Sequence, residues 1–205
     1  MKIFAVGMNY AAHYRELHPD KPLPTEPVIF LKPDSALLKD SNPFFLPNFS
    51  ERIEYETELV VRINRLGKCI PERFASRYYD AATVGIDLTA RDLQQKLAEA
   101  GNPWEISKGF DGAAVIGDFV SVEQLRDIRQ QSFRLDIDGK TVQEGNTSDM
   151  IFGVNRIISY ISHFFTLKIG DLLYTGTPAG VGPVHIGQHL EGFLGDKKVL
   201  NFYVR

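Results

Sequence analysis

Three glutamates on alternate residues are the most chemically informative feature of this sequence. Glu54, Glu56 and Glu58 lie in a segment that is otherwise rich in β-branched and apolar residues. Alternate side chains of a β-strand point to the same face, so neighbouring carboxylates here are expected roughly 7 Å apart. Anionic groups this close repel one another unless a cation lies between them, and carboxylate oxygens suit Mg²⁺, Mn²⁺ or Ca²⁺. The pattern indicates either a divalent metal site or an exposed strand with an acidic solvent face.

Two further charged residues are candidates for the same site. Asp87 ends an apolar run, where an acid caps a helix, pairs with an arginine such as Arg91, or binds a metal. Lys108 lies among apolar residues and glycines. It is therefore either a surface lysine or a cation placed in a cleft, where it would stabilise a developing enolate.

Two other motifs are compatible with catalysis. His13 and Glu16 are three residues apart, so in a helix they would face each other as a histidine–carboxylate dyad. Residues 175–182 contain glycines that allow a ligand to approach the backbone, and threonines that offer hydroxyl groups. This loop lacks the Gly-Lys-Ser/Thr ending of a phosphate-binding loop, so nucleotide binding is not expected.

The composition is that of an ordinary globular protein. The chain has 205 residues, 43% of them hydrophobic and 24% charged, which suits a single domain over residues 1–205. The net charge of −3 gives no electrostatic basis for binding nucleic acid or an anionic membrane, and no apolar run is long enough to span a bilayer. The lone Cys69 is expected to be a buried thiol. We expect a cytoplasmic protein, with mitochondria left open.

Short β-like segments dominate the chain, and helices are few. Strands are predicted at residues 2–6, 27–31, 55–63, 83–88, 133–137, 172–174 and 199–204. Asp138-Gly139 predicts a hairpin. Helices are predicted after an N-cap at Thr89, with Asp92 in the capping box, and over residues 154–164, where an apolar stripe includes Phe164. Strands and helices do not alternate regularly, so we expect a strand-rich α+β fold of mixed β-sheets.

Motifs spread along nearly the whole chain resemble those of the fumarylacetoacetate hydrolase family. The likeness is to its short single-domain branch, which contains acylpyruvate hydrolases and oxaloacetate decarboxylases, and the pair Pro103-Trp104 favours the acylpyruvase-like members. The matching positions are 7–10, 13, 16, 30–33, 55–59, 87–92, 103–104, 108, 143–145, 147, 150–152, 170–171 and 175–182. Met8 departs from the pattern, because related sequences often carry arginine or leucine there.

The resemblance implies a barrel-like core of mixed β-sheets and a homodimer. It also implies a role for each candidate residue: Mg²⁺ or Mn²⁺ bound by Glu56, Glu58 and Asp87, catalysis by Lys108 and the dyad of His13 and Glu16, and substrate binding by Arg91, Gly176 and Thr177. Residues 9–26 would form an active-site lid, whose later part is a proline-rich loop. Glu54 lies outside the implied ligand set.

A small 2-oxo acid suits such a site, because its C1 carboxylate and C2 keto oxygen can chelate the metal. Breaking a bond to C3 leaves a metal-bound pyruvate enolate, which Lys108 would stabilise. The expected reactions are acylpyruvate hydrolysis, with a water activated by His13 and Glu16, and oxaloacetate decarboxylation. The alternatives are the isomerisation or decarboxylation of 2-hydroxyhepta-2,4-diene-1,7-dioate in aromatic meta-cleavage catabolism, and a non-catalytic Ca²⁺-binding interaction protein.

Overall fold

A mixed sheet of eight strands forms the centre of the structure, a computed structural model that describes residues 1–17, 19–125 and 127–205. In spatial order the strands are β2 (Val28–Lys32), β1 (Ile3–Gly7), β12 (Leu172–Tyr174), β5 (Thr57–Ile63), β6 (Tyr79–Asp87), β8 (Ala114–Ile116) and β3 (Leu37–Leu38), with β9 (Val120–Ser121) paired to β6. Neighbouring strands are antiparallel, except that β1 is parallel to β12 and β3 is parallel to β8.

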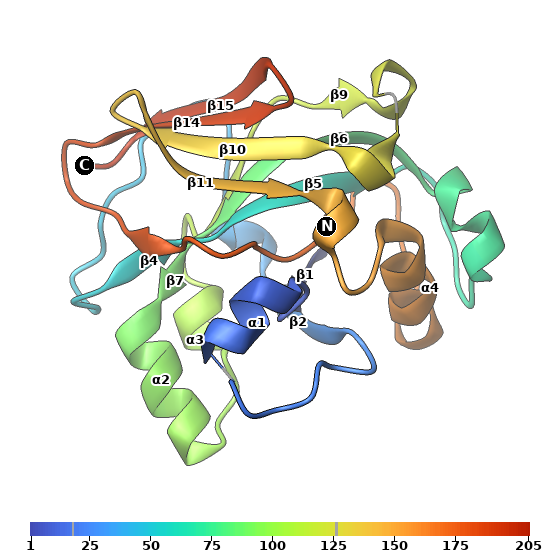
Figure 1. Cartoon of the computed structure of the whole chain (residues 1–205), viewed down its shortest axis with the longest axis horizontal. Coiled ribbons are helices and arrows are strands. Elements are labelled where there is room, and N and C mark those ends of the chain that lie inside the picture. The colour runs from blue at the N-terminus through green and yellow to red at the C-terminus, as the bar shows by residue number, and fades with distance from the viewer. Residues whose placement is uncertain (18, 126) are drawn as a thin grey trace.

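Two smaller sheets accompany the central one. The four-stranded sheet, at the top of Figure 1, contains β11 (Lys140–Asn146), β10 (Ser132–Ile137), β14 (His189–Leu194) and β15 (Lys197–Tyr203). The three-stranded sheet contains β13 (Gly182–Pro183), β4 (Ile53–Tyr55) and β7 (Thr89–Ala90). Asp138 and Gly139, both at positive φ, turn β10 into β11, so the predicted hairpin is confirmed.

Four α-helices and five 3₁₀ turns connect the strands of the described residues. The α-helices are α1 (Ala11–Leu17), α2 (Arg91–Ala100), α3 (Glu105–Lys108) and α4 (Val154–Phe164). The 3₁₀ turns are Asp34–Ala36, Glu72–Arg77, Val122–Gln124, Ile128–Gln130 and Thr147–Asp149. Figure 1 shows α1, α2 and α3 grouped together, away from the four-stranded sheet. The predicted strand-rich α+β fold of mixed sheets is confirmed. None of the described helices has the length and apolar character needed to cross a membrane.

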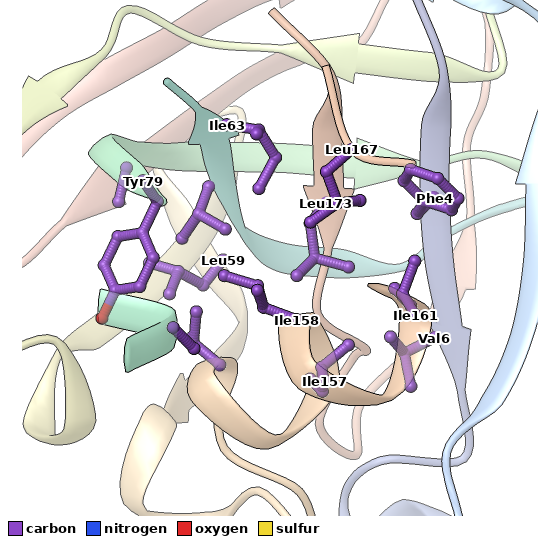
Figure 2. Close-up of a cluster of buried hydrophobic side chains, with 14 of the residues drawn as sticks. Phe4, Val6, Leu59, Ile63, Tyr79, Ile157, Ile158, Ile161, Leu167 and Leu173 are labelled. Carbon is purple, nitrogen blue, oxygen red and sulfur yellow. The ribbon is translucent and has the colours of Figure 1, made fainter. Parts of the chain in front are cut away.

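The central sheet is buried on both faces. Phe4, Val6 and Leu59 lie on the face covered by α4, which contributes Ile157, Ile158 and Ile161 (Figure 2). The alternate residues Ile3, Ala5 and Val60 pack on the other face. Because both faces are covered, β1 is a continuous apolar run and β5 has apolar residues on both faces, so the strands that carry the candidate site have little freedom to move.

Three local predictions were wrong. Helix α2 begins at Arg91, Thr89 belongs to strand β7, and Asp92 accepts hydrogen bonds from Ser50 and Glu51 instead of closing a capping box. Cys69 is exposed, because it occupies a bend with φ of +49°. Phe164 is 62% exposed at the end of α4, although the helix itself spans the predicted residues 154–164.

Candidate metal and catalytic site

Strand pairing brings Glu56, Glu58 and Asp87 together. Strands β5 and β6 pair with Thr57 opposite Ile86 and Glu58 opposite Gly85, and the amide of Asp87 donates to the carbonyl of Glu56 at 2.9 Å. Asp87 therefore lies opposite Glu56, with Glu58 two residues further along the same face. One carboxylate oxygen from each of the three residues lies within 4.8 Å of the others.

The three carboxylates are buried, which excludes an exposed acidic strand. Glu56, Glu58 and Asp87 are 7%, 1% and 1% exposed, and Glu54 is 2% exposed. Glu56 lies between β4 and β5, so Glu54 belongs to the three-stranded sheet and Glu58 to the central sheet. Buried carboxylates are costly unless cations or hydrogen-bond donors compensate them.

Two buried lysines contact the carboxylates from the side of α3 and β2. Lys108 Nζ lies 2.8 Å from Glu56 Oε2, 3.0 Å from Asp87 Oδ2 and 2.6 Å from Thr89 Oγ1. Lys32 Nζ lies 2.6 Å from Asp87 Oδ1, and it also donates to the carbonyls of Lys108 and Ala113. Lys32 thus contacts both the Asp87 carboxylate and the backbone of Lys108.

Arg91 joins Glu54 to Glu56 and does not pair with Asp87. Its Nε lies 2.6 Å from Glu54 Oε2 and its Nη2 lies 2.6 Å from Glu56 Oε1. Arg52 also contacts Glu54, although its own side chain is 62% exposed. Glu54 is therefore a buried ion-pair partner of two arginines. It is not one of the three converging carboxylates, and the ion pairs account for an acidic residue at this position.

The electrostatic environments of Glu56 and Glu58 differ sharply. Burial alone raises the pKa of Glu56, but the Lys108 ammonium and the Arg91 guanidinium outweigh burial and hold that pKa below its ordinary value. Burial, together with the charges of Asp87 and Glu56, raises the pKa of Glu58 well above its ordinary value. Glu58 is the carboxylate that most lacks a cation.

The donor set fits a hard divalent ion. All three converging groups are carboxylates, the ligands that Mg²⁺ and Mn²⁺ prefer. Glu56 and Asp87 form ion pairs with Lys32, Lys108 and Arg91, whereas Glu58 has no ion-pair partner among the described residues. A dication held by Glu56, Glu58 and Asp87 would satisfy the carboxylate whose pKa is raised.

Metal affinity is therefore expected to depend on pH through Glu58. A metal must displace the proton that burial favours on this carboxylate, so Mn²⁺ affinity should rise with pH below the raised pKa and level off above it. Calorimetric titration of Mn²⁺ from about pH 5 to about pH 8 measures this dependence. Glu54→Gln is the control and should keep the same slope, whereas an affinity that is flat in pH would contradict the assignment of Glu58 as a ligand.

The loop after β12 contacts the same carboxylates. The amide of Gly176 donates to Glu58 Oε2 at 2.6 Å, so this glycine is a partner of the carboxylate. Thr177 Oγ1 donates to the carbonyl of Thr57 and accepts from Gln143 Nε2 at 2.8 Å. Gln143 Oε1 in turn accepts from the amide of Thr57 at 2.9 Å, which ties this loop to the strand that carries Glu56 and Glu58.

A cavity of about 470 Å³ opens beside Glu56 and Asp87, a volume suited to a small ligand, and Glu58 lies outside its lining. Its lining includes Glu56, Asp87, Arg91, Lys108 and Thr177, and on the side of α1 it includes Met8 and His13. Helix α1 places His13 Nδ1 3.5 Å from Glu16 Oε2, as the spacing of three predicts. His13 is 5% exposed and Glu16 lies at the surface, so the pair connects the cavity with solvent.

Comparison with known proteins identifies the family. The family model for the fumarylacetoacetate (FAA) hydrolase C-terminal region matches residues 2–204. The chain belongs to the fumarylacetoacetate hydrolase family. This confirms the resemblance seen in the sequence motifs.

Two relatives of known name and one solved structure illustrate the likeness. The mitochondrial oxaloacetate decarboxylase of Dictyostelium discoideum is 43% identical, over 91% of this chain and 85% of that protein. The human mitochondrial oxaloacetate tautomerase FAHD1 is 38% identical, over 92% of this chain and 85% of that protein. The crystal structure of fumarylpyruvate hydrolase from Pseudomonas aeruginosa, in complex with Mn²⁺ and pyruvate, has a TM-score of 0.91 at 36% identity, covering 100% of this chain and 89% of that one.

The structure thus gathers most of the residues singled out in the sequence. Glu56, Glu58, Asp87, Lys108 and Arg91 are in direct contact or within a few ångströms, and His13 and Thr177 line the same cavity. From the sequence, Lys32 and Gln143 are only positions that match the family motifs and Thr89 is only a predicted N-cap within such a motif, so none of the three is assigned a role in the site. Lys32 follows an apolar strand and Gln143 follows a hairpin, and nothing in either local pattern indicates burial.

Proposed function

We propose that this chain is a metal-dependent enzyme that cleaves C–C bonds of small 2-oxo acids, by acylpyruvate hydrolysis, oxaloacetate decarboxylation or both. The observation that carries the proposal is the convergence of Glu56, Glu58 and Asp87 beside the Lys108 ammonium at a cavity. The named relatives support it, since oxaloacetate and fumarylpyruvate are both 2-oxo acids.

Glu56, Glu58 and Asp87 would hold Mg²⁺ or Mn²⁺, and the Mn²⁺ in the Pseudomonas structure supports this choice. When bound, the ion supplies a Lewis acid that draws electron density toward the C2 oxygen of the substrate. An ion held by these carboxylates would also attract the C1 carboxylate of a 2-oxo acid.

Lys108 is proposed to stabilise the enolate formed at C3. Its pKa is raised because Asp87 and Glu56 outweigh the effect of burial, so the side chain stays cationic. In acylpyruvate hydrolysis, the oxygen of a water forms a bond to C4 and the C3–C4 electron pair becomes the enolate of pyruvate. Protonation at C3 then gives pyruvate and a carboxylic acid. The ammonium favours this step through the negative charge that appears only as the bond breaks.

His13 is proposed as the base that takes the proton from the attacking water, with Glu16 orienting the imidazole. Both residues lie on α1, in the segment 9–26 that we propose as a lid over the cavity. Residue 18 of this segment lies outside the described residues. Oxaloacetate decarboxylation needs no attacking water, because C4 is already a carboxylate and leaves as carbon dioxide. The dyad is therefore required by one of the two reactions only.

A transfer of protons alone is the second candidate. The human relative is named a tautomerase, a reaction in which a proton moves and no C–C bond breaks. Isomerisation of 2-hydroxyhepta-2,4-diene-1,7-dioate belongs to the same class. A non-catalytic calcium-binding role is set aside, because the lysines and the arginine that surround the carboxylates are suited to chemistry and the relatives are enzymes.

A side-by-side assay distinguishes these reactions. Purified protein is given acetylpyruvate, oxaloacetate and the hydroxydienoate, each with Mg²⁺, with Mn²⁺ and with a chelator. We expect metal-dependent release of pyruvate from acetylpyruvate, from oxaloacetate or from both. Turnover of the hydroxydienoate alone would favour the isomerase, and the absence of metal-dependent turnover on all three would overturn the proposal.

Lys108→Met is expected to leave a protein that binds a 2-oxo acid but turns it over at least about a hundredfold more slowly. The reason is that the ammonium acts on the charge of the transition state more than on the ground state. Steady-state kcat and binding of oxalate by calorimetry measure the two effects separately. Lys68→Met, at an exposed lysine that donates to the carbonyl of His163, is the control. An undiminished kcat in the Lys108 variant would rule out this role.

Domain organisation, assembly and location complete the proposal. We propose that residues 1–205 form one catalytic domain that works as a homodimer in the cytoplasm. Support for self-association comes from the exposed Phe49 and Ile106, which line one apolar groove with Leu93 and Phe110. Light scattering coupled to size exclusion tests the dimer.

The Dictyostelium and human relatives are named as mitochondrial, so the compartment is best tested by fractionation.

A further inference from the structure

Asn9 is a buried polar residue that the reaction, as described, does not use. It lies between β1 and α1 and is 0% exposed. Its Nδ2 donates to the carbonyls of Thr175 at 2.7 Å and Phe152 at 3.0 Å, and its Oδ1 accepts from the amide of Phe152 at 2.8 Å. Both donor hydrogens and the acceptor are thus engaged, which fixes the side chain in one orientation.

The contact with Thr175 leads directly to Glu58. The carbonyl of Thr175 and the amide of Gly176 belong to the same peptide unit, which is planar, with its C=O and N–H on opposite sides. Asn9 holds the carbonyl side, while the amide side donates to Glu58 Oε2 at 2.6 Å. The asparagine therefore sets the direction of the hydrogen bond that Glu58 receives.

Close packing around Gly176 further restricts the orientation of the Thr175–Gly176 peptide. Gly176 has φ of +97°, and a Cβ built on it would lie 2.7 Å from the Cβ of Asn9. Asn9 and the turn are thus in van der Waals contact as well as hydrogen-bonded, so the turn has no room to rotate away from Glu58.

Asn9 also holds the start of helix α1. Its backbone carbonyl accepts from the amide of Ile151 at 2.7 Å, and the carbonyl of the next residue, Tyr10, accepts from the amide of Tyr14 in the first turn of the helix. His13 lies within that turn. Asn9 therefore fixes two things: the start of the segment that carries His13 and Glu16, and the Thr175–Gly176 peptide that contacts Glu58.

We propose that Asn9 is a positioning residue that couples the lid helix to the metal site through the Thr175–Gly176 peptide. This proposal rests on the proposed function. In this arrangement the orientation of Glu58 and the placement of His13 depend on the same side chain. Loss of the Asn9 amide releases both, and the reaction that needs the dyad suffers more than the reaction that does not.

The test is Asn9→Asp, in which an acceptor replaces the amide donor that faces two carbonyls. We expect the Kd for Mn²⁺, measured by calorimetry or paramagnetic resonance, to rise about tenfold or more. We also expect kcat for acetylpyruvate hydrolysis to fall by a larger factor than kcat for oxaloacetate decarboxylation. Asn9→Ser, which keeps a small polar group and is too short to reach Thr175, replaces the first variant should that one fail to fold.

Ser162→Ala provides the matched control. Ser162 is 0% exposed, its hydroxyl accepts from the amide of Ile70 and donates to the carbonyl of Ser159, and it lies on α4 away from the cavity. This variant should lower stability without changing Mn²⁺ affinity or the ratio of the two activities. Asn9 variants that behave like Ser162→Ala would overturn the proposal. A wild-type protein without Mn²⁺ affinity would instead refute the proposed function itself.

One apolar wall of the cavity gives a second, independent indication, which concerns the substrate. Met8, Phe30 and Trp104 line it, with the Phe30 and Trp104 rings in an edge contact at 5.8 Å. Met8 has φ of +62°, a conformation that few residues other than glycine adopt, and it presents a side chain to the cavity. The Phe30 ring lies 5.4 Å from the Lys108 ammonium, so this wall adjoins the lysine and would contact the acyl group attached to C3 of a 2-oxo acid.

The basic residues of the cavity already have partners. Among the described residues of its lining, these are His13, Arg91 and Lys108. Arg91 is bound to Glu54 and Glu56, Lys108 is bound to Glu56 and Asp87, and His13 lies beside Glu16. Gln95 at the rim donates to Glu99, a further negative group. A second carboxylate at the far end of a substrate would lose water without gaining a cation.

We infer that the enzyme selects acylpyruvates with a neutral, apolar acyl group over those that end in a carboxylate. This inference also rests on the proposed function. Butanoylpyruvate and succinylpyruvate test it, because their acyl groups have the same carbon count and differ by a terminal methyl or carboxylate. We expect kcat/KM to favour butanoylpyruvate by about tenfold or more.

Met8→Arg should reduce or cancel the preference by placing a guanidinium in the apolar wall, raising kcat/KM for succinylpyruvate about tenfold. Gln124→Arg, at an exposed position on the 3₁₀ turn Val122–Gln124, is the charge-matched control and should change neither substrate. Equal kcat/KM values for the two substrates in the wild type, or a Met8→Arg variant that gains nothing on succinylpyruvate, would overturn the inference. Turnover of neither substrate would contradict acylpyruvate hydrolysis itself.

Discussion

Glu56→Gln is expected to abolish both Mn²⁺ binding and the turnover of every 2-oxo acid. Glu56 offers one of the three converging carboxylates and also pairs with Lys108 and Arg91. An amide keeps the shape of the side chain but removes the negative charge, so the ion loses a ligand and two buried cations lose a partner. We expect a loss of about a thousandfold or more in kcat/KM, as for the removal of a metal ligand that the chemistry requires.

Glu54→Gln is the matched control for this experiment. Glu54 is just as buried, lies two residues earlier and shares Arg91 with Glu56, but it is not among the three converging carboxylates. The control should reduce stability while keeping measurable Mn²⁺ affinity and metal-dependent turnover. Normal Mg²⁺-dependent rates in Glu56→Gln, or equal losses in the two variants, would refute the proposed ligand set.

His13→Ala is expected to slow acylpyruvate hydrolysis far more than oxaloacetate decarboxylation. Acylpyruvate hydrolysis should fall about a hundredfold to ten-thousandfold, the usual contribution of a general base. Oxaloacetate decarboxylation should be largely kept, because no water attacks in that reaction. Mn²⁺ affinity should be nearly unchanged, since His13 lies on α1 and contacts Glu16 and none of the three carboxylates.

The measurements are kcat on both substrates and calorimetry with Mn²⁺. His163→Ala removes an exposed histidine of α4 and should leave all three values unchanged. A collapse of metal binding in His13→Ala would show that the histidine belongs to the metal site and not to a dyad. Equal loss of both reactions would remove the distinction between a step that needs water and one that does not.

The triplet of glutamates shows what the sequence could predict. Alternation placed Glu56 and Glu58 on one face, and the apolar run before Asp87 placed that residue at a strand end, which are both local properties. The pairing of β5 with β6, which sets Asp87 opposite Glu56, depends on a register that no local pattern fixes. The family resemblance supplied that connection, and the fold agrees with it.

The remaining partners of the site depend on contacts between distant segments. Lys32 reads as the polar end of an edge strand, yet it is buried because Lys108 and Ala113 bring carbonyls to its ammonium. Asn9 reads as a turn residue, yet its amide bonds residues more than a hundred positions away. A long-range contact also explains the wrong prediction for the start of α2. The carboxylate of Asp92, predicted to close a capping box, accepts a hydrogen bond from the hydroxyl of Ser50 instead.

Diffraction from crystals grown with Mn²⁺ and oxalate, a mimic of the pyruvate enolate, tests the central claim most directly. We predict one anomalous peak, bounded by a carboxylate oxygen each from Glu56, Glu58 and Asp87, with oxalate on the same ion and the Lys108 ammonium beside it. Carboxylates without a bound ion at saturating Mn²⁺, or an ion held elsewhere while these three residues keep only their lysine and arginine partners, would contradict the claim.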